Sequence, residues 1–397
     1  MYSFDWTARR RPTGNAKLES YGRLKSAFSC VLALAFGLVW LGSLSVYAQN
    51  PSSFDELSAQ ASRARSSGDI PRAIQLYQQA VALNSKWQDG WWSLGFLQYQ
   101  SNDYSAAQNS LTHFLEFSPR SGPALALRGL CEFETGDYSQ SLEDIQSGLA
   151  LGAATGARNE QVLRYHAALL LTRAGSFQGA LQQYTWFADK GISSPDLFLG
   201  LGLAGLRSPK LPQDVPPDDN EMFTLAGSAI YQFMAHRQDQ AAQAFQDFFR
   251  RYPKAANAHY VYGYLLVQAD PDHAIQEFKR ELEVSPSNAE ANVMLAWTYL
   301  LLDEPAQALP YARSAFVSQP SLSVSLLVLG RSLVGTGNLK DGAQYLEKAA
   351  LIDPNNLEIH IALAHVYSEE GRKQDSWRER QLSLQLENHG AVQSANQ

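Results

Sequence analysis

The sequence has few of the residues from which disulfide-rich or catalytic proteins are built. Only two cysteines occur in 397 residues, Cys30 and Cys131. Loss of an N-terminal segment containing Cys30 would leave Cys131 alone, and no internal disulfide could then form. Cys131 falls at a helical position, where we predict a small buried core residue.

Groups for catalysis, phosphate binding or metal binding are also lacking. No glycine-rich phosphate-binding loop is present, and the eight histidines are scattered. His360 and His365 are five residues apart, which places them on different faces of a helix, and we find no third ligand near His259 and His273. We therefore predict a protein that is not an enzyme and has no metal site or cofactor.

Basic clusters are missing beyond the N-terminus. The net charge is −7, and residues 1–48 hold six basic and two acidic residues. Removing residues 1–48 would take away a net four positive charges and change the net charge to −11. Such an acidic chain argues against nucleic acid or an anionic membrane surface as a partner of the remaining residues.

Charge is absent altogether between Ser26 and Phe54, where residues 30–46 form a strongly apolar run. A basic segment precedes it, and it ends in small residues at Val46 and Ala48, which is the order of a secretory signal. We predict cleavage between Ala48 and Gln49. An uncleaved anchor, spanning a membrane through residues 26–47, remains open. Both alternatives place the rest of the chain outside the cytoplasm. The junction is typical of bacteria, which predicts the periplasm or the outer face of the inner membrane.

What the sequence has in abundance is helical periodicity. Residues 89–119 contain two helical patterns joined by a turn at Asn102 and Asp103, with Asp103 as the expected N-cap, and Pro119 ends the second helix. Small and large apolar residues in these patterns recur along the chain. Pro286, Pro320 and Pro354, for example, follow one another at intervals of 34 residues. Such a period indicates stacked helix-turn-helix repeats.

The order Trp91, Leu94-Gly95, Ala107, Phe114 and Pro119 resembles the signature of the tetratricopeptide repeat (TPR) family, over about residues 54–387. The resemblance implies an all-α, right-handed superhelix, an α-solenoid. In it a Gly or Ala at the eighth position of each unit allows two helices to approach closely. We predict a signal or anchor at 1–48, an N-terminal array at 54–190, an orphan helix with a Pro-rich insertion at 191–221, a C-terminal array at 222–373, a capping helix at 374–388 and a tail at 389–397.

The insertion interrupts the array. Residues 207–220 contain four prolines and no apolar periodicity, so they cannot continue a helix. They form either a surface loop or a bend or recognition loop between two arrays. Near the C-terminus, residues 374–387 depart from the repeat and carry the polar face that a capping helix requires.

The resemblance also implies a concave face, lined by positions two, five, nine, twelve and thirteen of each first helix. We call these positions the first-helix face. Residues there that we predict to bind a partner are Trp92, Phe96, Tyr99, Phe133, Tyr165, Phe233, Tyr260, Tyr264, Trp297 and Arg331. They form a predicted aromatic groove poor in charge, without the Lys, Asn and Arg of a carboxylate clamp. Alternatively, several of these rings pack between adjacent first helices.

These features predict a non-enzymatic scaffold or assembly factor of the bacterial cell envelope, which binds an extended or helical protein segment. A binding module for a small apolar or glycan ligand is one alternative, and an accessory subunit of an envelope enzyme is another. An open groove would favour the scaffold, and a sealed pocket would favour the small ligand.

Overall fold

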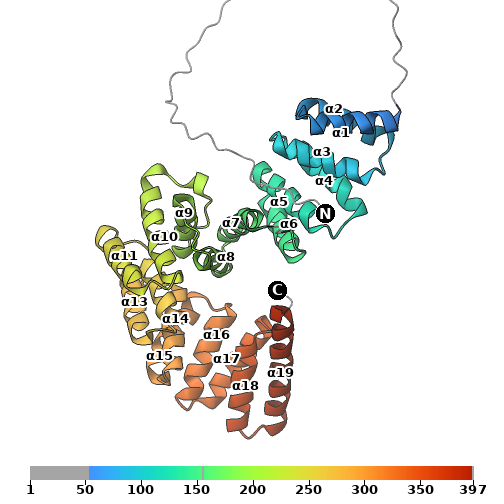
Figure 1. Ribbon diagram of the computed structural model, residues 1–397. Helices are drawn as coiled ribbons and strands as arrows, with labels where there is room; N and C mark the ends of the chain where they lie inside the picture. Colours follow the sequence, from blue (N-terminus) through green and yellow to red (C-terminus); the bar gives the residue numbers. More distant parts are fainter. Residues whose placement is uncertain (1–52, 154–155, 396–397) are drawn as a thin grey trace, which may run out of the picture. The chain divides into compact units, whose positions relative to one another are not determined.

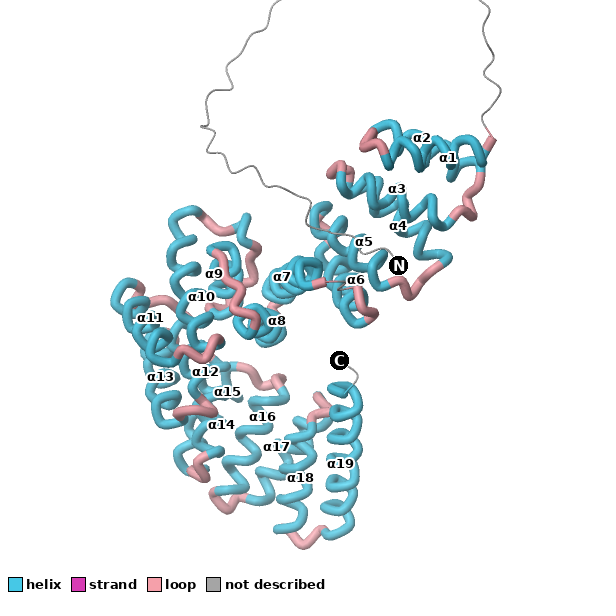
Figure 2. The backbone as a smooth tube through the Cα atoms, in the orientation of Figure 1, coloured by secondary structure: helices cyan, strands magenta, loops and turns pink. Residues whose placement is uncertain are grey.

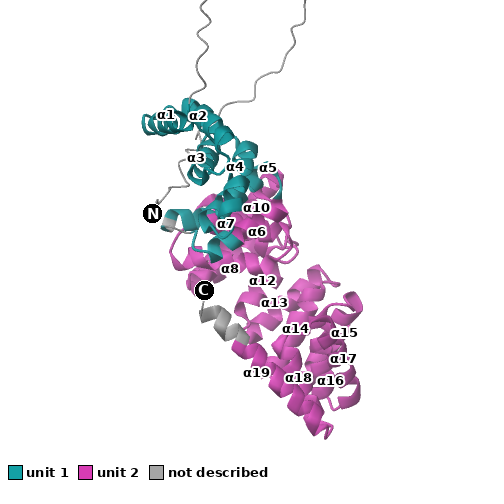
Figure 3. Cartoon of the chain, turned by 90° about the vertical axis from the view of Figure 1, so that its right-hand side faces the viewer, with its two compact units in different colours: residues 1–137, 147–162 teal, residues 138–146, 163–397 magenta. Residues whose placement is uncertain are grey.

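The computed structural model describes residues 53–153 and 156–395, and every regular element in these ranges is helical (Figures 1 and 2). Among them, no helix is both long and apolar enough to cross a membrane. The predicted signal segment at 1–48 and the cleavage site at Ala48 and Gln49 lie outside the described residues. The chain forms two compact units, residues up to 137 with 147–162, and residues 138–146 with 163–397 (Figure 3).

The first unit is built from consecutive antiparallel helices. These are α1 (Phe54–Ser66), α2 (Ile70–Leu83), α3 (Gln88–Gln100), α4 (Tyr104–Phe117) and α5 (Gly122–Thr135), while α6 (Tyr138–Ala150) and α7 (Ala157–Arg173) are divided between the units. The predicted turn before α4 is confirmed. Asn102 has a φ of 60°, and the Asp103 carboxylate accepts a hydrogen bond of 3.3 Å from the Ala106 N–H.

The second unit continues the same pattern. Its remaining helices are α8 (Phe177–Asp189), α9 (Pro195–Gly205), α10 (Asn220–Met234), α11 (Gln238–Arg251), α12 (Ala258–Leu266), α13 (Pro271–Val284), α14 (Ala289–Leu301), α15 (Pro305–Ser318), α16 (Ser323–Gly335), α17 (Leu339–Ile352), α18 (Leu357–Glu369) and α19 (Lys373–Ala395). From α10 onward the even-numbered helices are the first helices of the repeats, and each packs on the helix that follows it. The predicted all-α repeat architecture is therefore confirmed.

Small residues set the distance between paired helices, as the sequence predicted. A Cβ atom added to Gly95 would lie 2.9 Å from Cγ of Leu111, and one added to Gly330 would lie 2.7 Å from Cγ of Leu346. The alanines at the equivalent contacts of other helices have no exposed surface; they include Ala73, Ala107, Ala180, Ala274 and Ala308. Larger residues at these points would force the helices of a unit apart.

The helix before the insertion differs from our prediction of an orphan. α9 packs against α10 through two glycines, because a Cβ on Gly202 would lie 1.8 Å from the Phe223 carbonyl oxygen and a Cβ on Gly227 would lie 1.8 Å from the Phe198 carbonyl oxygen. α9 therefore has a close helical neighbour across the insertion. The insertion contains the short 3₁₀ helices η1 (Pro212–Asp214) and η2 (Pro217–Asp219) and buries Leu211.

The C-terminal helix is longer than we predicted. α19 runs to Ala395, so residues 389–395, predicted as a tail, are helical. Ser376, which stands where a repeat would have Ala, is buried and donates a hydrogen bond of 2.7 Å to the Ala364 carbonyl. Trp377, the next residue, is 65% exposed. α19 thus packs on α18 with one face and meets solvent with another.

Candidate functional site

Part of the predicted first-helix face is covered by a side chain from the insertion. The rings of Tyr260 and Tyr264 on α12 are stacked, with centroids 6.4 Å apart. The Arg207 guanidinium lies 5.4 Å from the Tyr260 ring centroid and 4.9 Å from that of Phe177. Arg207 also donates a hydrogen bond of 2.8 Å to Glu290 Oε1. An internal contact therefore occupies the position at which we expected Tyr260 to meet a partner.

Burial has a chemical consequence for Tyr260. Loss of solvent raises the pKa of its phenol to about 12, while the positive charge of Arg207 opposes this rise. The ring also packs against Phe278, with centroids 6.1 Å apart. For Tyr260, contacts with the insertion and with α13 therefore leave less of the ring open to a partner than we predicted.

Trp297 and Arg331 form a second group on adjacent first helices. The Arg331 guanidinium lies 4.9 Å from the centre of the Trp297 ring, which is a cation–π contact. The same guanidinium lies 3.6 Å from the carboxylate of Glu358. The pairing links α14, α16 and α18 along one face of the array.

The remaining predicted residues are distributed over both units. Trp92 stacks on Phe96 with centroids 6.4 Å apart, and Phe96 is buried. Tyr165 donates a hydrogen bond of 3.2 Å to the Asp196 carbonyl. Trp92, Phe96, Tyr99 and Phe133 belong to the first unit, and Tyr165, Phe233, Tyr260, Tyr264, Trp297 and Arg331 to the second. Their role in binding a partner stays a prediction.

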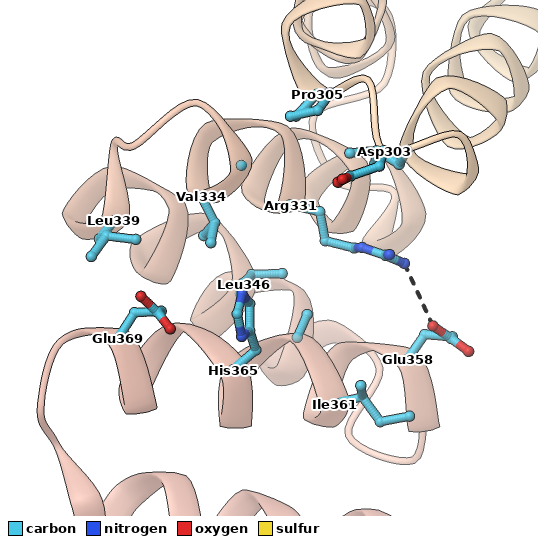
Figure 4. Close-up of a pocket in the computed structure, with 13 residues that line it drawn as sticks. Asp303, Pro305, Arg331, Val334, Leu339, Leu346, Glu358, Ile361, His365 and Glu369 are labelled. Atoms are coloured by element: carbon cyan, nitrogen blue, oxygen red, sulfur yellow. Dashed lines mark ion pairs between the residues drawn. The ribbon is translucent and has the colours of Figure 1, made fainter.

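A cavity of about 580 Å³ opens on the first-helix face of the last repeats (Figure 4). We call it the C-terminal groove. Its lining consists of Leu300, Asp303, Pro305, Arg331, Val334, Gly335, Leu339, Leu346, Glu358, Ile361, Ala362, His365 and Glu369. Of the predicted residues only Arg331 lines it. No Phe, Tyr or Trp lines it, and three carboxylates do, so this groove differs from the aromatic, charge-poor surface we predicted.

Four groove residues that we did not predict occupy positions of the first-helix face. In α18, Glu358, Ile361, His365 and Glu369 stand at positions two, five, nine and thirteen of the last unit. Our selection of candidates ended at Arg331, in the unit before. Carrying the same positions one repeat further would have found the α18 side of the groove from the sequence.

A buried carboxylate joins the two histidines for which we predicted no third ligand. Glu277 is 1% exposed; its Oε2 lies 2.6 Å from His259 Nδ1 and its Oε1 lies 3.3 Å from His273 Nε2. Arg280 pairs with the same carboxylate. Within the described ranges no group of three or more His, Cys, Asp or Glu is placed to hold a metal ion. The histidines and Arg280 instead provide partners for a buried negative charge.

Cys131 is a core residue, as predicted. Its side chain has no exposed surface, and burial raises the pKa of its thiol to about 12. A thiol that is buried and protonated in this way is chemically inert near neutral pH.

Paired helices that pack through small residues, repeated along the chain with a groove on one face, define the class of α-helical repeat proteins. A family model for the tetratricopeptide repeat matches residues 58–107, 229–270 and 264–321. The chain therefore contains tetratricopeptide repeats. No curated protein sequence matches it.

Solved structures of MamA resemble parts of the array. One, MamA 41-end from Desulfovibrio magneticus RS-1, is 17% identical, with a TM-score of 0.39 over 43% of this chain and 96% of that chain. Another crystal structure of MamA is 18% identical, with a TM-score of 0.37 over 41% of this chain and 96% of that chain. At these TM-scores the likeness carries no argument about partners.

Proposed function

We propose that this protein is a non-enzymatic scaffold that holds a segment of a partner protein in the C-terminal groove. The observation that carries the proposal is the groove itself, because it lies at the positions that the repeat pattern reserves for binding. Its rim is open, since Ile361 is 47% exposed. An apolar side chain exposed beside a hollow of this size suits a peptide segment better than a small ligand sealed from water.

We further propose that the scaffold acts in the bacterial envelope, as an assembly factor for envelope or secretion machinery. Support comes from the sequence of residues 1–48, with its basic segment, apolar run and small-residue junction. The scaffold would then reside in the periplasm, or remain anchored to the inner membrane through residues 26–47.

Site-specific photo-crosslinking in the native cell tests both proposals. A photoreactive residue at Ile361 should crosslink one reproducible envelope protein, because that side chain stands at the rim of the groove. The matched control is Val317, which is 78% exposed at the end of α15 and does not line the groove. Crosslinking from Val317 should not capture the same protein. The intact mass of the bait shows whether residues 1–48 have been removed.

Three results would count against the proposals. Equal capture from Ile361 and Val317, or none from Ile361 with the bait folded, would exclude the groove as the site of a stable protein partner. A low-molecular-weight adduct at Ile361 would instead support the small-ligand alternative. A cytoplasmic bait with intact residues 1–48 would exclude the envelope.

A further inference from the structure

One face of α18 forms an ordered stripe along the C-terminal groove. Glu358, Ile361, His365 and Glu369 follow one another at intervals of three and four residues, which places them on one side of the helix. Glu358 and Glu369 stand at its two ends, about 16 Å apart along the helix axis at 1.5 Å per residue. Figure 4 shows the two carboxylates on opposite sides of His365. The groove thus has an acidic group at each end.

The charge of the groove is unbalanced. Asp303, Glu358 and Glu369 contribute three negative charges, and Arg331 contributes one positive charge, which leaves −2 with His365 neutral. Arg331 is shared between Glu358 and the Trp297 ring. Asp303 and Glu369 are exposed and form no ion pair with any residue in the described part of the chain. These two carboxylates can therefore form ion pairs with basic side chains of a partner.

Between the acidic ends the floor of the groove is apolar. Half-buried Val334 and the edge of Ala362 form part of it, and Leu346, which has no exposed surface, packs beneath them. Ile361 adds an exposed aliphatic side chain at the rim. Water covering such a floor is displaced favourably by aliphatic side chains.

From this arrangement we infer that the C-terminal groove selects a short apolar segment of a partner protein that carries Lys or Arg on both sides. The inference rests on the proposed function and specifies the partner's chemistry. Since the Debye length is about 8 Å at physiological ionic strength, carboxylates about 16 Å apart are screened from each other. Because Arg331 already pairs with Glu358, the basic residues of the partner meet Glu369 at one end and Asp303, which lies beside Arg331, at the other (Figure 4). An acidic segment or a free carboxyl terminus would meet uncompensated negative charge.

Selection from a phage-displayed library of random peptides tests the inference on the folded full chain. The recovered peptides should have aliphatic residues flanked on both sides by Lys or Arg. A synthetic peptide of the recovered sequence should bind about two- to fivefold more weakly to Glu369→Gln and to Asp303→Asn, because each change removes one exposed ion pair. Glu283→Gln, at an exposed carboxylate on α13 outside the groove, is the matched control and should leave binding unchanged.

Charge reversal gives a sharper result. Selection on Glu369→Lys should recover peptides whose basic flank on that side is replaced by Asp or Glu. Ile361→Ser should abolish binding without unfolding, since the side chain is half exposed.

Recovered peptides with acidic flanks, or with flanks that do not respond to Glu369→Lys, would overturn the inference, as would self-association of the chain that Ile361→Ser abolishes. A protein crosslinked at Ile361 through a segment without basic flanks would leave the scaffold proposal intact and exclude only this chemistry.

Discussion

Arg207 shows how a single residue fixes the insertion to the repeats. It is the first residue of the insertion and has a φ of 55°. Its side chain reaches Phe177, Tyr260 and Glu290, and its partner Glu290 is 83 residues away in the sequence. The repeat pattern gives no signal for such a contact, because the insertion has no periodicity. Sequence reasoning therefore placed Tyr260 on a binding surface, whereas an internal guanidinium covers it.

The raised pKa of Tyr260 predicts a loss of stability at high pH. The unfolded chain releases this phenolic proton near pH 10, but the folded protein holds it until about pH 12. Between these values the unfolded state binds fewer protons, so the free energy of unfolding decreases as pH rises. Below pH 10 the contribution is fully present. We expect Tyr260 to account for a decrease of about 2 kcal/mol by pH 12.

Urea denaturation at pH 9 and at higher pH, with Tyr260→Phe as comparison, measures this contribution. The variant keeps the ring against Arg207 and Phe278 but has no phenolic proton, so its stability should decrease less between the two values. The other tyrosines titrate equally in both proteins and cancel in the difference. Parallel pH profiles for the two proteins would contradict the burial of this hydroxyl.

At the scale of elements, the contact between α9 and α10 depends on the absence of side chains at two points. Gly202 and Gly227 allow backbone to meet backbone, because an added Cβ at either position would lie 1.8 Å from a carbonyl oxygen. Backbone cannot move aside as a side chain can. We therefore expect Gly202→Ala to lower the free energy of unfolding by at least about 3 kcal/mol, at the upper end of overpacking costs.

Gly179→Ala is the matched control, because Gly179 lies inside α8 and an added Cβ would first meet only the Ser176 hydroxyl, at 3.0 Å. Replacing a helical glycine by alanine stabilises a helix by about 1 kcal/mol when there is room. Urea midpoints of the two variants should therefore shift in opposite directions. A Gly202→Ala variant as stable as the parent would show that α9 and α10 do not approach so closely.

The elements themselves were largely predictable, whereas their irregular contacts were not. Asn102, Asp103 and the alanines at helix crossings act locally or at a fixed period, so the sequence shows them directly. Gly202 looks like any glycine in a helical pattern, and its partner Phe223 lies beyond a segment rich in proline. The close packing across the insertion therefore required the structure.

At the scale of the whole molecule, repeats are stabilised by their neighbours, so the last repeat depends on α19. α19 supplies Glu379, 2.7 Å from Nδ1 of the buried His360, and Ser376, which bonds to the Ala364 carbonyl. α18 presents Ile361 and Glu369 to the groove. α19, the capping helix, and the groove thus share α18, so the packing of α19 helps to keep the groove formed. The positions of the first-helix face could locate the groove from the sequence, but they could not predict that it depends on α19.

Detaching α19 from α18 should therefore disrupt the groove while leaving the earlier repeats folded. Ser376→Glu places a carboxylate at a buried position whose hydroxyl now donates to the Ala364 carbonyl, and an unpaired buried charge costs several kcal/mol. In hydrogen exchange on the full chain, we expect protection to fall in α18 and α19 and to persist in α12 and α13, because stability in a repeat array is local. Gln381→Glu adds the same charge at an exposed position of α19 and should change neither protection nor peptide binding. Loss of protection throughout the second unit would show instead that it unfolds as one cooperative body, in which case a substitution far from the groove could regulate binding as strongly as one in the cap.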